Sequence, residues 1–437
     1  MVDLWSRLNR FLILGVESGT YYVGEREHTL DNIAVIDACF DADPYRTIGT
    51  AIQVSDEGRA AKNDYAIWVF AKAAAHPNIG VRHYALARLG YVCRTGTHIL
   101  MFASFVDQLR GWGPSLRKAV ARWFLERTPD QLAYQVLKYQ QRNGWSMRDL
   151  LRLSHPQTDD PGQNAVLAWV AQKPHNTLDE PKILYGFETA KKVHDPSQIA
   201  YLVRNFGLTR EMVPSQFLAD PTVLRALAEK SPYTALIRNL GNFTRAGLDL
   251  ELGLDLVSKI TNPNAISNSR IHPINLLTAL RTYASGGGWR GSNNWSVNPA
   301  IERALEQAFY LSFANVPATN KRYYIGMDIS GSMSRQINNT NLSARDVAAA
   351  IAMLLTRNEP WTKVVGFDRN PMDLTPGAEE SLGAYITRTQ CWGGGATDCA
   401  QPMLDALSKG LMVDTFIVIT DNETWAGRIN PDAVLRQ

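Results

Sequence analysis

Roughly the first 318 residues repeat apolar side chains at intervals of three and four, and this periodicity most restricts the possible folds. It predicts amphipathic helices in series from about residue 30. Clear examples cover 67–76, 84–94, 115–127 and 131–142. Ser146, with Asp149 three positions later, predicts the start of a further helix, which Pro156 ends. Such a series is typical of stacked helix pairs in an α-solenoid, and an irregular helical bundle would give the same pattern.

The pattern changes near residue 319, where short apolar runs begin to alternate with helical segments. We expect strands at 323–327, 363–368 and 414–421, and helices at 344–357 and after Asp398. This alternation predicts βαβ units and a parallel α/β sheet. We therefore expect two domains, a helical one at 1–318 and an α/β one at 319–437. Three evident strands are few for a doubly wound sheet, so we expect the α/β domain to be truncated at its C-terminus.

Polar residues with oxygen ligands follow the predicted strands of the α/β region. They are Asp328, Ser330, Ser332, Thr397 and Asp421. Because ligands gather at the carboxyl ends of parallel strands, we expect these side chains to converge. Two carboxylates and three hydroxyls are hard ligands that suit Mg²⁺ or Mn²⁺, and no histidine or thiolate among them favours zinc.

Acids after strands also have structural and catalytic roles. Asp and Ser are common after strands as helix caps, and a cap or loop role fits Asp398 and Asp368 better than ligation. A phosphatase with an Asp nucleophile needs a second acid two residues later, and that position is Ser330. The GxxxxGK[ST], GxSxG and HExxH motifs are also missing from the sequence. We therefore expect binding and no catalysis.

Positive charge is concentrated between residues 110 and 155, which hold nine basic and three acidic residues, whereas the whole chain has a net charge of +3. Two pairs spaced four apart, Lys118 with Arg122 and Lys138 with Arg142, would each share a helical face. The interleaved aromatic residues are Trp112, Trp123, Tyr139 and Trp145. Cations for phosphates and aromatics for bases predict a nucleic-acid interface, and a solvated helix face over a core is the alternative.

The remaining composition bears on the compartment. Four scattered cysteines form no CxxC pair, which argues against a zinc knuckle or a disulfide framework and favours a reducing, cytoplasmic setting. No apolar run approaches the roughly 18 residues of a membrane-spanning helix, so we expect no membrane partner.

Several long blocks resemble the Ro autoantigen family, the TROVE-domain proteins. They are KYQQRNGWSMRDLLRLSHP (138–156), LIRNLGNFTRAG (236–247), RIHPINLLTALRTYASGGGWRG (270–291), MDISGSM (327–333) and VITDNETWAG (418–427). The resemblance implies a ring of HEAT-like helical repeats closed by a von Willebrand factor A domain with a metal-ion-dependent adhesion site. It also implies binding of small noncoding Y RNAs on the outer surface, and of misfolded RNAs whose single-stranded 3′ ends enter the central hole.

Site residues follow from the resemblance position by position. Asp328, Ser330, Ser332, Thr397 and Asp421 match the metal-site pattern. Lys138, Arg142 and His155 match positions associated with Y RNA, and we add Lys118 and Arg122 from the charge pattern. The alternative for His155 is a local cap or a core residue, which is the more frequent role of a lone histidine near a helix end. The chain departs from the family at Ala396, where a glycine is usual, and at Met147, where a histidine is common.

These observations lead to an expected Ro-type RNA-binding protein of RNA quality control or the stress response, with Mg²⁺ or Mn²⁺ as its ion. Its RNA partners would be small noncoding RNAs and misfolded or single-stranded RNAs, and a ribonuclease or another protein would be a further partner. Single-stranded ends would use diffuse charge that includes Arg238 and Arg290. The alternatives are a metal-dependent protein-adhesion module on a helical scaffold and, third, a Mg²⁺-dependent phosphohydrolase.

Overall fold

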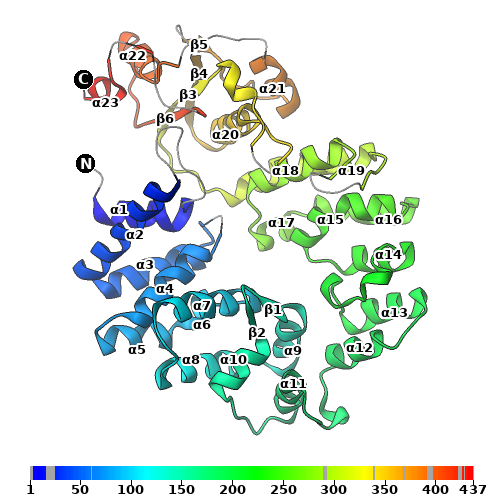
Figure 1. Ribbon diagram of the computed structural model, residues 1–437. Helices are drawn as coiled ribbons and strands as arrows, with labels where there is room; N and C mark the ends of the chain where they lie inside the picture. The colour runs from blue at the N-terminus through cyan, green and yellow to red at the C-terminus, as the bar shows by residue number, and fades with distance from the viewer. Residues whose placement is uncertain are drawn as a thin grey trace. The chain divides into compact units, whose positions relative to one another are not determined.

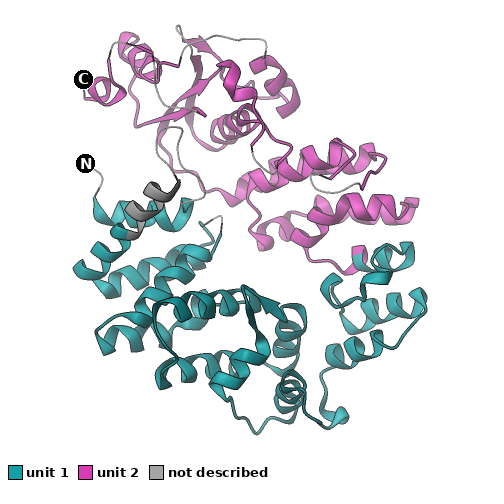
Figure 2. Cartoon of the chain, viewed as in Figure 1, with its two compact units in different colours: residues 1–227 teal, residues 228–437 magenta. Residues whose placement is uncertain are grey.

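The computed structural model describes residues 3–15, 25–60, 62–288, 293–337, 340–367, 371–390, 397–421, 426–427 and 429–436. Figure 1 shows that helices dominate the first three quarters of the chain and that a sheet follows them. The chain forms two compact units, residues 1–227 and residues 228–437, which Figure 2 colours separately. Each unit is described by itself below. The closed ring that the resemblance implies concerns the placement of these units relative to one another, and it stays a prediction.

Among its described residues, the first unit forms helices and one small hairpin (Figure 1). Its helices are α1 (Leu4–Leu14), α2 (Glu25–Ala42), α3 (Pro44–Asp56), α4 (Asp64–Ala75), α5 (Ile79–Ala87), α6 (Leu89–Val92), α7 (Gly96–Leu109), α8 (Pro114–Leu125), α9 (Pro129–Lys138), α10 (Met147–Ser154), α11 (Pro161–Ala171), α12 (Lys182–Ala190) and α13 (Pro196–Phe206). The hairpin consists of β1 (Gln141–Arg142) and β2 (Trp145–Ser146). Helix α14 (Pro221–Lys230) runs across the division between the units.

Local signals place most of these helices. α4 and α8 confirm the helices predicted at 67–76 and 115–127, and a proline at the first turn of α8 is compatible with a helix start because that N–H has no helical partner. The capping box predicted at Ser146 is present: its hydroxyl accepts from the Asp149 N–H, while the Asp149 carboxylate accepts from the Ser146 N–H.

Two helix predictions in this unit were wrong. The segment 84–94 is not one helix, because Arg88 leaves helical geometry between α5 and α6. The break lets Leu89 and Val92 bury their side chains in α6, which packs on α3. The helix predicted at 131–142 ends at Lys138, and Arg142 lies in the hairpin.

The second unit begins with helices and ends with an α/β region. Its helices are α15 (Tyr233–Arg245), α16 (Leu250–Ile260), α17 (Pro263–Ser269), α18 (Pro273–Ala284), α19 (Pro299–Leu311), α20 (Ala344–Asn358), α21 (Leu382–Gln390), α22 (Gln401–Ser408) and α23 (Pro431–Leu435). Its strands are β3 (Arg322–Asp328), β4 (Trp361–Phe367), β5 (Met372–Asp373) and β6 (Thr415–Ile419). The strand order in the sheet is β5-β4-β3-β6.

The sheet confirms the parallel α/β prediction, with one addition. β3 lies between β4 and β6 and is parallel to both, with Asp328 opposite Phe367. The sequence analysis missed β5, a short antiparallel strand beside β4. β3 is apolar and buried, and Gly326 leaves room for α22: a Cβ there would lie 2.2 Å from the Pro402 ring. The sheet and α22 therefore hold the carboxyl end of β3 in place, and with it the start of the loop that follows.

The α/β region is tied to the helices that precede it within the second unit. The Asn358 amide donates to the carbonyls of Phe313 (3.0 Å) and Val316 (2.9 Å). Arg281 of α18 forms an ion pair with Asp346 of α20 at 3.0 Å. The division between the compact units falls after residue 227 and not at the change of secondary structure near residue 319. The domain boundary at 318 stays a prediction.

Two further findings concern the described residues alone. None of their helices combines the length and apolar composition needed to cross a membrane. Cys39 and Cys93 are buried free thiols, Cys399 is also buried, and Cys391 lies outside the described residues.

Candidate functional site

The predicted oxygen ligands meet at the carboxyl ends of β3 and β6. Asp328 ends β3 and is fully buried, and its Oδ1 accepts from the Ser330 N–H at 2.8 Å. The hydroxyls of Ser330 and Ser332 are 2.9 Å apart, and Ser332 donates to Asp421 Oδ1 at 3.0 Å. Thr397 Oγ1 reaches Asp328 Oδ2 at 3.4 Å. A continuous set of short contacts therefore joins all five residues.

Two residues that the sequence analysis missed complete this cluster. Thr420 donates to Asp328 Oδ2 at 2.7 Å, and its place beside Asp421 at the end of a strand was the signal for it. Arg345 of α20 is buried, and its Nη2 donates to the carbonyls of Ile329 (3.3 Å) and Ser330 (3.0 Å). Arg345 thereby fixes the loop that presents both serines, and nothing in its sequence context indicated this.

The electrostatics of the cluster favour a cation. A buried carboxylate is costly unless charge or hydrogen bonds compensate it, and Asp328 forms no ion pair with any described residue. Its described partners are hydroxyls and one backbone N–H. No group of three or more His, Cys, Asp or Glu among the described residues could hold a metal, so hydroxyl oxygens would have to share the ligation here. The residues present fit a hard divalent ion.

Asp398, the acid that directly follows Thr397, has a structural role. Asp398 lies just before α22 rather than at its N-cap, Ala400; its carboxylate accepts from the Ala400 N–H at 3.1 Å and from the Gln401 amide at 2.8 Å. This supports the local structural role predicted for Asp398. Asp368 and Ala396 lie outside the described residues.

The predicted basic surface lies in the first unit and comes from four elements, α8, α9, β1 and the end of α10. Lys118 and Arg122 share an exposed face of α8, as predicted, and Arg122 Nη1 also donates to the Ala87 carbonyl at 3.3 Å. Lys138 ends α9, Arg142 lies on β1, and His155 follows α10. In Figure 1 these elements lie close together in the cyan part of the chain.

Lys138 and Arg142 do not project from one helix, which corrects the prediction. An Asn143–Gly144 turn, with φ of 52° and 78°, closes the hairpin and pairs Arg142 with Trp145. Asn-Gly favours this type of two-residue turn because both residues must adopt positive φ. The turn leaves the Arg142 side chain exposed. The Asn-Gly pair was the signal that the sequence analysis overlooked.

The environments of Lys138 and His155 differ. Lys138 is half-buried, and its ammonium donates to the Tyr134 hydroxyl at 2.8 Å and lies over the Tyr139 ring at 5.4 Å. Burial lowers the pKa of Lys138, but the Tyr134 hydrogen bond and nearby phenols outweigh it, so the pKa lies above its usual value. His155 is exposed at the C-cap of α10, with φ of 47°, so the core role considered for it does not apply.

The aromatic residues of this surface divide into two groups. Trp112 and Trp145 are partly exposed, with ring centroids 5.3 Å apart. Trp123 is buried and its indole donates to the Cys93 carbonyl at 2.6 Å, so its predicted role as a stacking residue was wrong. A pocket of about 380 Å³ beside the hairpin, lined in part by Gln141, Arg148 and Lys191, was not predicted.

Comparisons with known proteins agree with this architecture. A family model of the TROVE domain matches residues 1–198 and 205–282, and one described as the Ro60 vWA domain matches residues 322–437. An RNA-binding protein RO60 from Deinococcus radiodurans is 37% identical over 443 residues, which cover 99% of this chain and 83% of that protein. One from Caenorhabditis elegans is 30% identical over 512 residues, covering 99% of this chain and 80% of that protein.

A solved structure extends the likeness to three dimensions. The crystal structure of the Deinococcus radiodurans RO (RSR) protein superposes with a TM-score of 0.87 at 36% sequence identity, covering 99% of this chain and 89% of that one. Sequence and fold therefore agree along nearly the whole chain. The chain belongs to the TROVE-domain family of Ro proteins.

Proposed function

We propose that this protein binds RNA in the manner of the Ro family, without catalysing a reaction. The observation that carries the proposal is the exposed basic surface of α8, β1 and the end of α10, whose cations Lys118, Arg122 and Arg142 are accessible to phosphates. The relatives named as RNA-binding proteins support it. Arg142 would hold a phosphate through its guanidinium, while Lys138 acts as a point charge.

The RNAs proposed for this surface are structured small noncoding RNAs of the Y type. His155 would add a hydrogen bond or a stacking contact, which a neutral imidazole provides at pH 7. Misfolded RNAs with single-stranded 3′ ends are the second proposed class, and the cellular role is RNA quality control or the stress response in the cytoplasm. Arg290, expected to contribute to single-strand binding, lies outside the described residues.

The direct test is binding of a structured small RNA and an unstructured RNA by the purified full chain at several salt concentrations. We expect both to bind and their affinities to fall steeply with salt, because phosphate contacts release counterions. Failure of the nuclease-treated protein to bind either RNA at low salt would refute the proposal. Absence of turnover with phosphate esters in Mg²⁺ is the expected result for a protein without catalysis.

A second proposal concerns the cluster at the end of β3. Asp328, Ser330, Ser332, Thr397 and Asp421 would hold one Mg²⁺ or Mn²⁺, some of them through water. When bound, the ion would supply positive charge for an acidic group from a protein partner, a ribonuclease being one candidate. The supporting observation is that Asp421 is exposed whereas Asp328 is buried, so the cluster has one accessible side. Mg²⁺-dependent capture of a protein partner, reversed by EDTA, is the test.

A further inference from the structure

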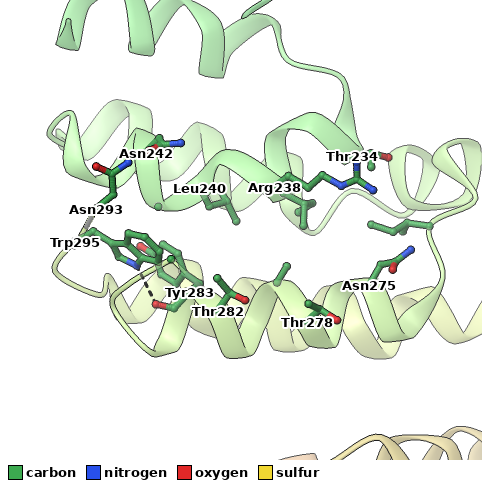
Figure 3. A pocket seen from close by; sticks show the side chains of 15 residues that line it. Thr234, Arg238, Leu240, Asn242, Asn275, Thr278, Thr282, Tyr283, Asn293 and Trp295 are labelled. Atoms are coloured by element: carbon green, nitrogen blue, oxygen red, sulfur yellow. Dashed lines mark hydrogen bonds between the residues drawn. The ribbon is translucent and has the colours of Figure 1, made fainter. Parts of the chain in front are cut away.

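The second unit contains a groove between two of its helices. It lies between α15 and α18, has a volume of about 410 Å³, and appears in Figure 3. Its polar lining comes from one face of each helix, at the helical spacing of three and four. These residues are Thr234, Arg238 and Asn242 on α15, and Asn275, Thr278 and Thr282 on α18.

One end of the groove carries a fixed aromatic ring. The Trp295 indole donates to the Tyr283 carbonyl at 2.9 Å, and the two rings stack with centroids 6.2 Å apart. Gly241 makes room for the indole, since a Cβ there would lie 2.6 Å from its ring carbons. Tyr283 is itself held through its hydroxyl, which contacts Thr244 at 2.9 Å. Trp295 thus remains partly exposed in the groove at a set position.

The charge in the groove has one sign. Arg238 is the single charged residue among the described lining residues. It is exposed, and no hydrogen bond or ion pair with another described residue engages its guanidinium. The other polar groups are neutral amides and hydroxyls, which can donate and accept. The groove therefore suits a ligand that carries negative charge at one end and neutral hydrogen-bonding groups elsewhere.

The order of these groups identifies the ligand class. Figure 3 shows Arg238 and Asn275 toward one end, and Trp295, Asn242 and Asn293 at the other. Arg238 and Asn242 are four residues apart on α15, so their backbone positions differ by about 6 Å along the helix axis. Figure 3 shows the Arg238 side chain directed toward Thr234, but it is exposed and no described contact fixes it there. With Arg238 turned along the groove toward Asn242, a phosphate at its guanidinium would place a base beside Trp295, where the amides of Asn242 and Asn293 can meet its edge.

We propose that the α15–α18 groove binds one nucleoside 5′-monophosphate unit, either free or within single-stranded RNA. The RNA form of this inference rests on the RNA binding proposed above, whereas the free-nucleotide form does not. A defined site for a single nucleotide would take the place of the diffuse charge expected to bind single-stranded RNA. Bases would be accepted by stacking, which tolerates different sequences, and the amides would bias the choice among them.

The test uses the full chain, adenosine 5′-monophosphate, a single-stranded oligoribonucleotide and a structured small RNA, each titrated calorimetrically. Arg238→Gln removes the charge, and Arg245→Gln is the matched control, an exposed arginine of the same helix that does not line the groove. We expect Arg238→Gln to weaken single-strand binding roughly tenfold or more and to flatten its salt slope by about 0.7, with Arg245→Gln near wild type. Trp295→Leu should weaken it roughly fivefold or more, and Trp295→Phe less.

The two ligands separate the sources of the nucleotide. If Arg238→Gln loses binding of both ligands, or of the oligonucleotide alone, the groove is a site for RNA. If Arg238→Gln loses binding of the monophosphate alone, the groove is a site for a free nucleotide. Wild-type affinity of Arg238→Gln for both overturns the inference, while structured-RNA binding would leave the proposed function standing. If the wild-type chain binds no RNA, the proposed function fails and the monophosphate titration still decides the groove. Circular dichroism establishes folding, and Arg238→Gln decides if Trp295→Leu does not fold.

Discussion

The end of β3 and the basic surface of the first unit hold their polar groups in opposite ways. At β3, a buried carboxylate and four hydroxyls form one connected set, and Arg345 fixes the loop beneath the serines. On the basic surface, Arg142 and His155 are exposed, and no described hydrogen bond links Lys138, Arg142 and His155 to one another. The first site is preorganised, whereas the second is a set of separate charges.

This difference predicts different responses to mutation and salt. Members of a connected cluster depend on one another, so removal of one should abolish the function of all. Separate exposed charges contribute small terms that are screened by salt and add nearly independently. The two regions should therefore differ in how strongly a single substitution acts.

Asp328→Ala should abolish binding of Mn²⁺ or Mg²⁺. Loss of a buried charged partner costs about 3 kcal/mol or more, a factor above one hundred in affinity. Isothermal titration calorimetry with Mn²⁺ measures the effect. Asp414→Asn is the control, because Asp414 comes just before the first residue of β6, at the end of the strand away from the cluster, and pairs with Arg322 at 2.8 Å. Wild-type ion affinity in the Asp328 variant would show that the cluster is not the ion site.

Acid should destabilise the first unit through His98. Burial, aided by the nearby Arg94, lowers the pKa of His98 from 6.5 to about 4. Because the folded-state pKa is depressed, stability is full above pH 6.5 and falls as the pH drops toward 4, by about 2 kcal/mol at pH 5. Urea unfolding at pH 7.5 and pH 5 tests this. His98→Gln, which does not titrate, should reduce the loss, and an equal loss in both proteins would exclude His98 as its cause.

Gly144→Ala should disturb the basic surface without removing a charge. Gly144 has φ of 78°, and alanine at such a position costs about 1 kcal/mol. We expect a lower unfolding midpoint and a several-fold loss of structured-RNA affinity, because the turn positions Arg142. Gly111→Ala is the control, since a Cβ there meets nothing within 4 Å and its φ is not positive. Unchanged RNA affinity would mean that Arg142 does not depend on the turn.

The contrast between the two regions also explains what could be predicted from sequence. Strand ends in a parallel sheet converge, so the local motifs at Asp328 and Asp421 were enough to predict that the loops after β3 and β6 meet, as the hydrogen bond from Ser332 to Asp421 shows. Helical periodicity predicted α4, α8 and α20 correctly but extended α9 beyond its end at Lys138. The residues before the Asn143–Gly144 turn favour a helix, so the hairpin was not predicted.

Other features depend on packing that no local pattern records. Trp123 lies between basic residues in the sequence and was predicted to be a surface aromatic, yet it lies in the core. Arg345 acts on a loop fifteen residues away through backbone carbonyls. The groove of α15 and α18 needs two helices brought together from separate parts of the chain, with Trp295 added from a later loop. Such sites become visible only when the tertiary structure is known.

Structured RNA is proposed to bind the basic surface, and the β3 cluster is not needed for this binding. The most direct measurement compares the salt dependence of binding of a structured small RNA by the wild-type chain, by Asp328→Ala and by the Lys138→Ala, Arg142→Ala double variant. The account predicts weaker binding by the double variant, with a plot of log affinity against log salt shallower by roughly 1.4 to 1.8 units, and an unchanged slope for Asp328→Ala. Wild-type affinity and slope in the double variant would contradict it.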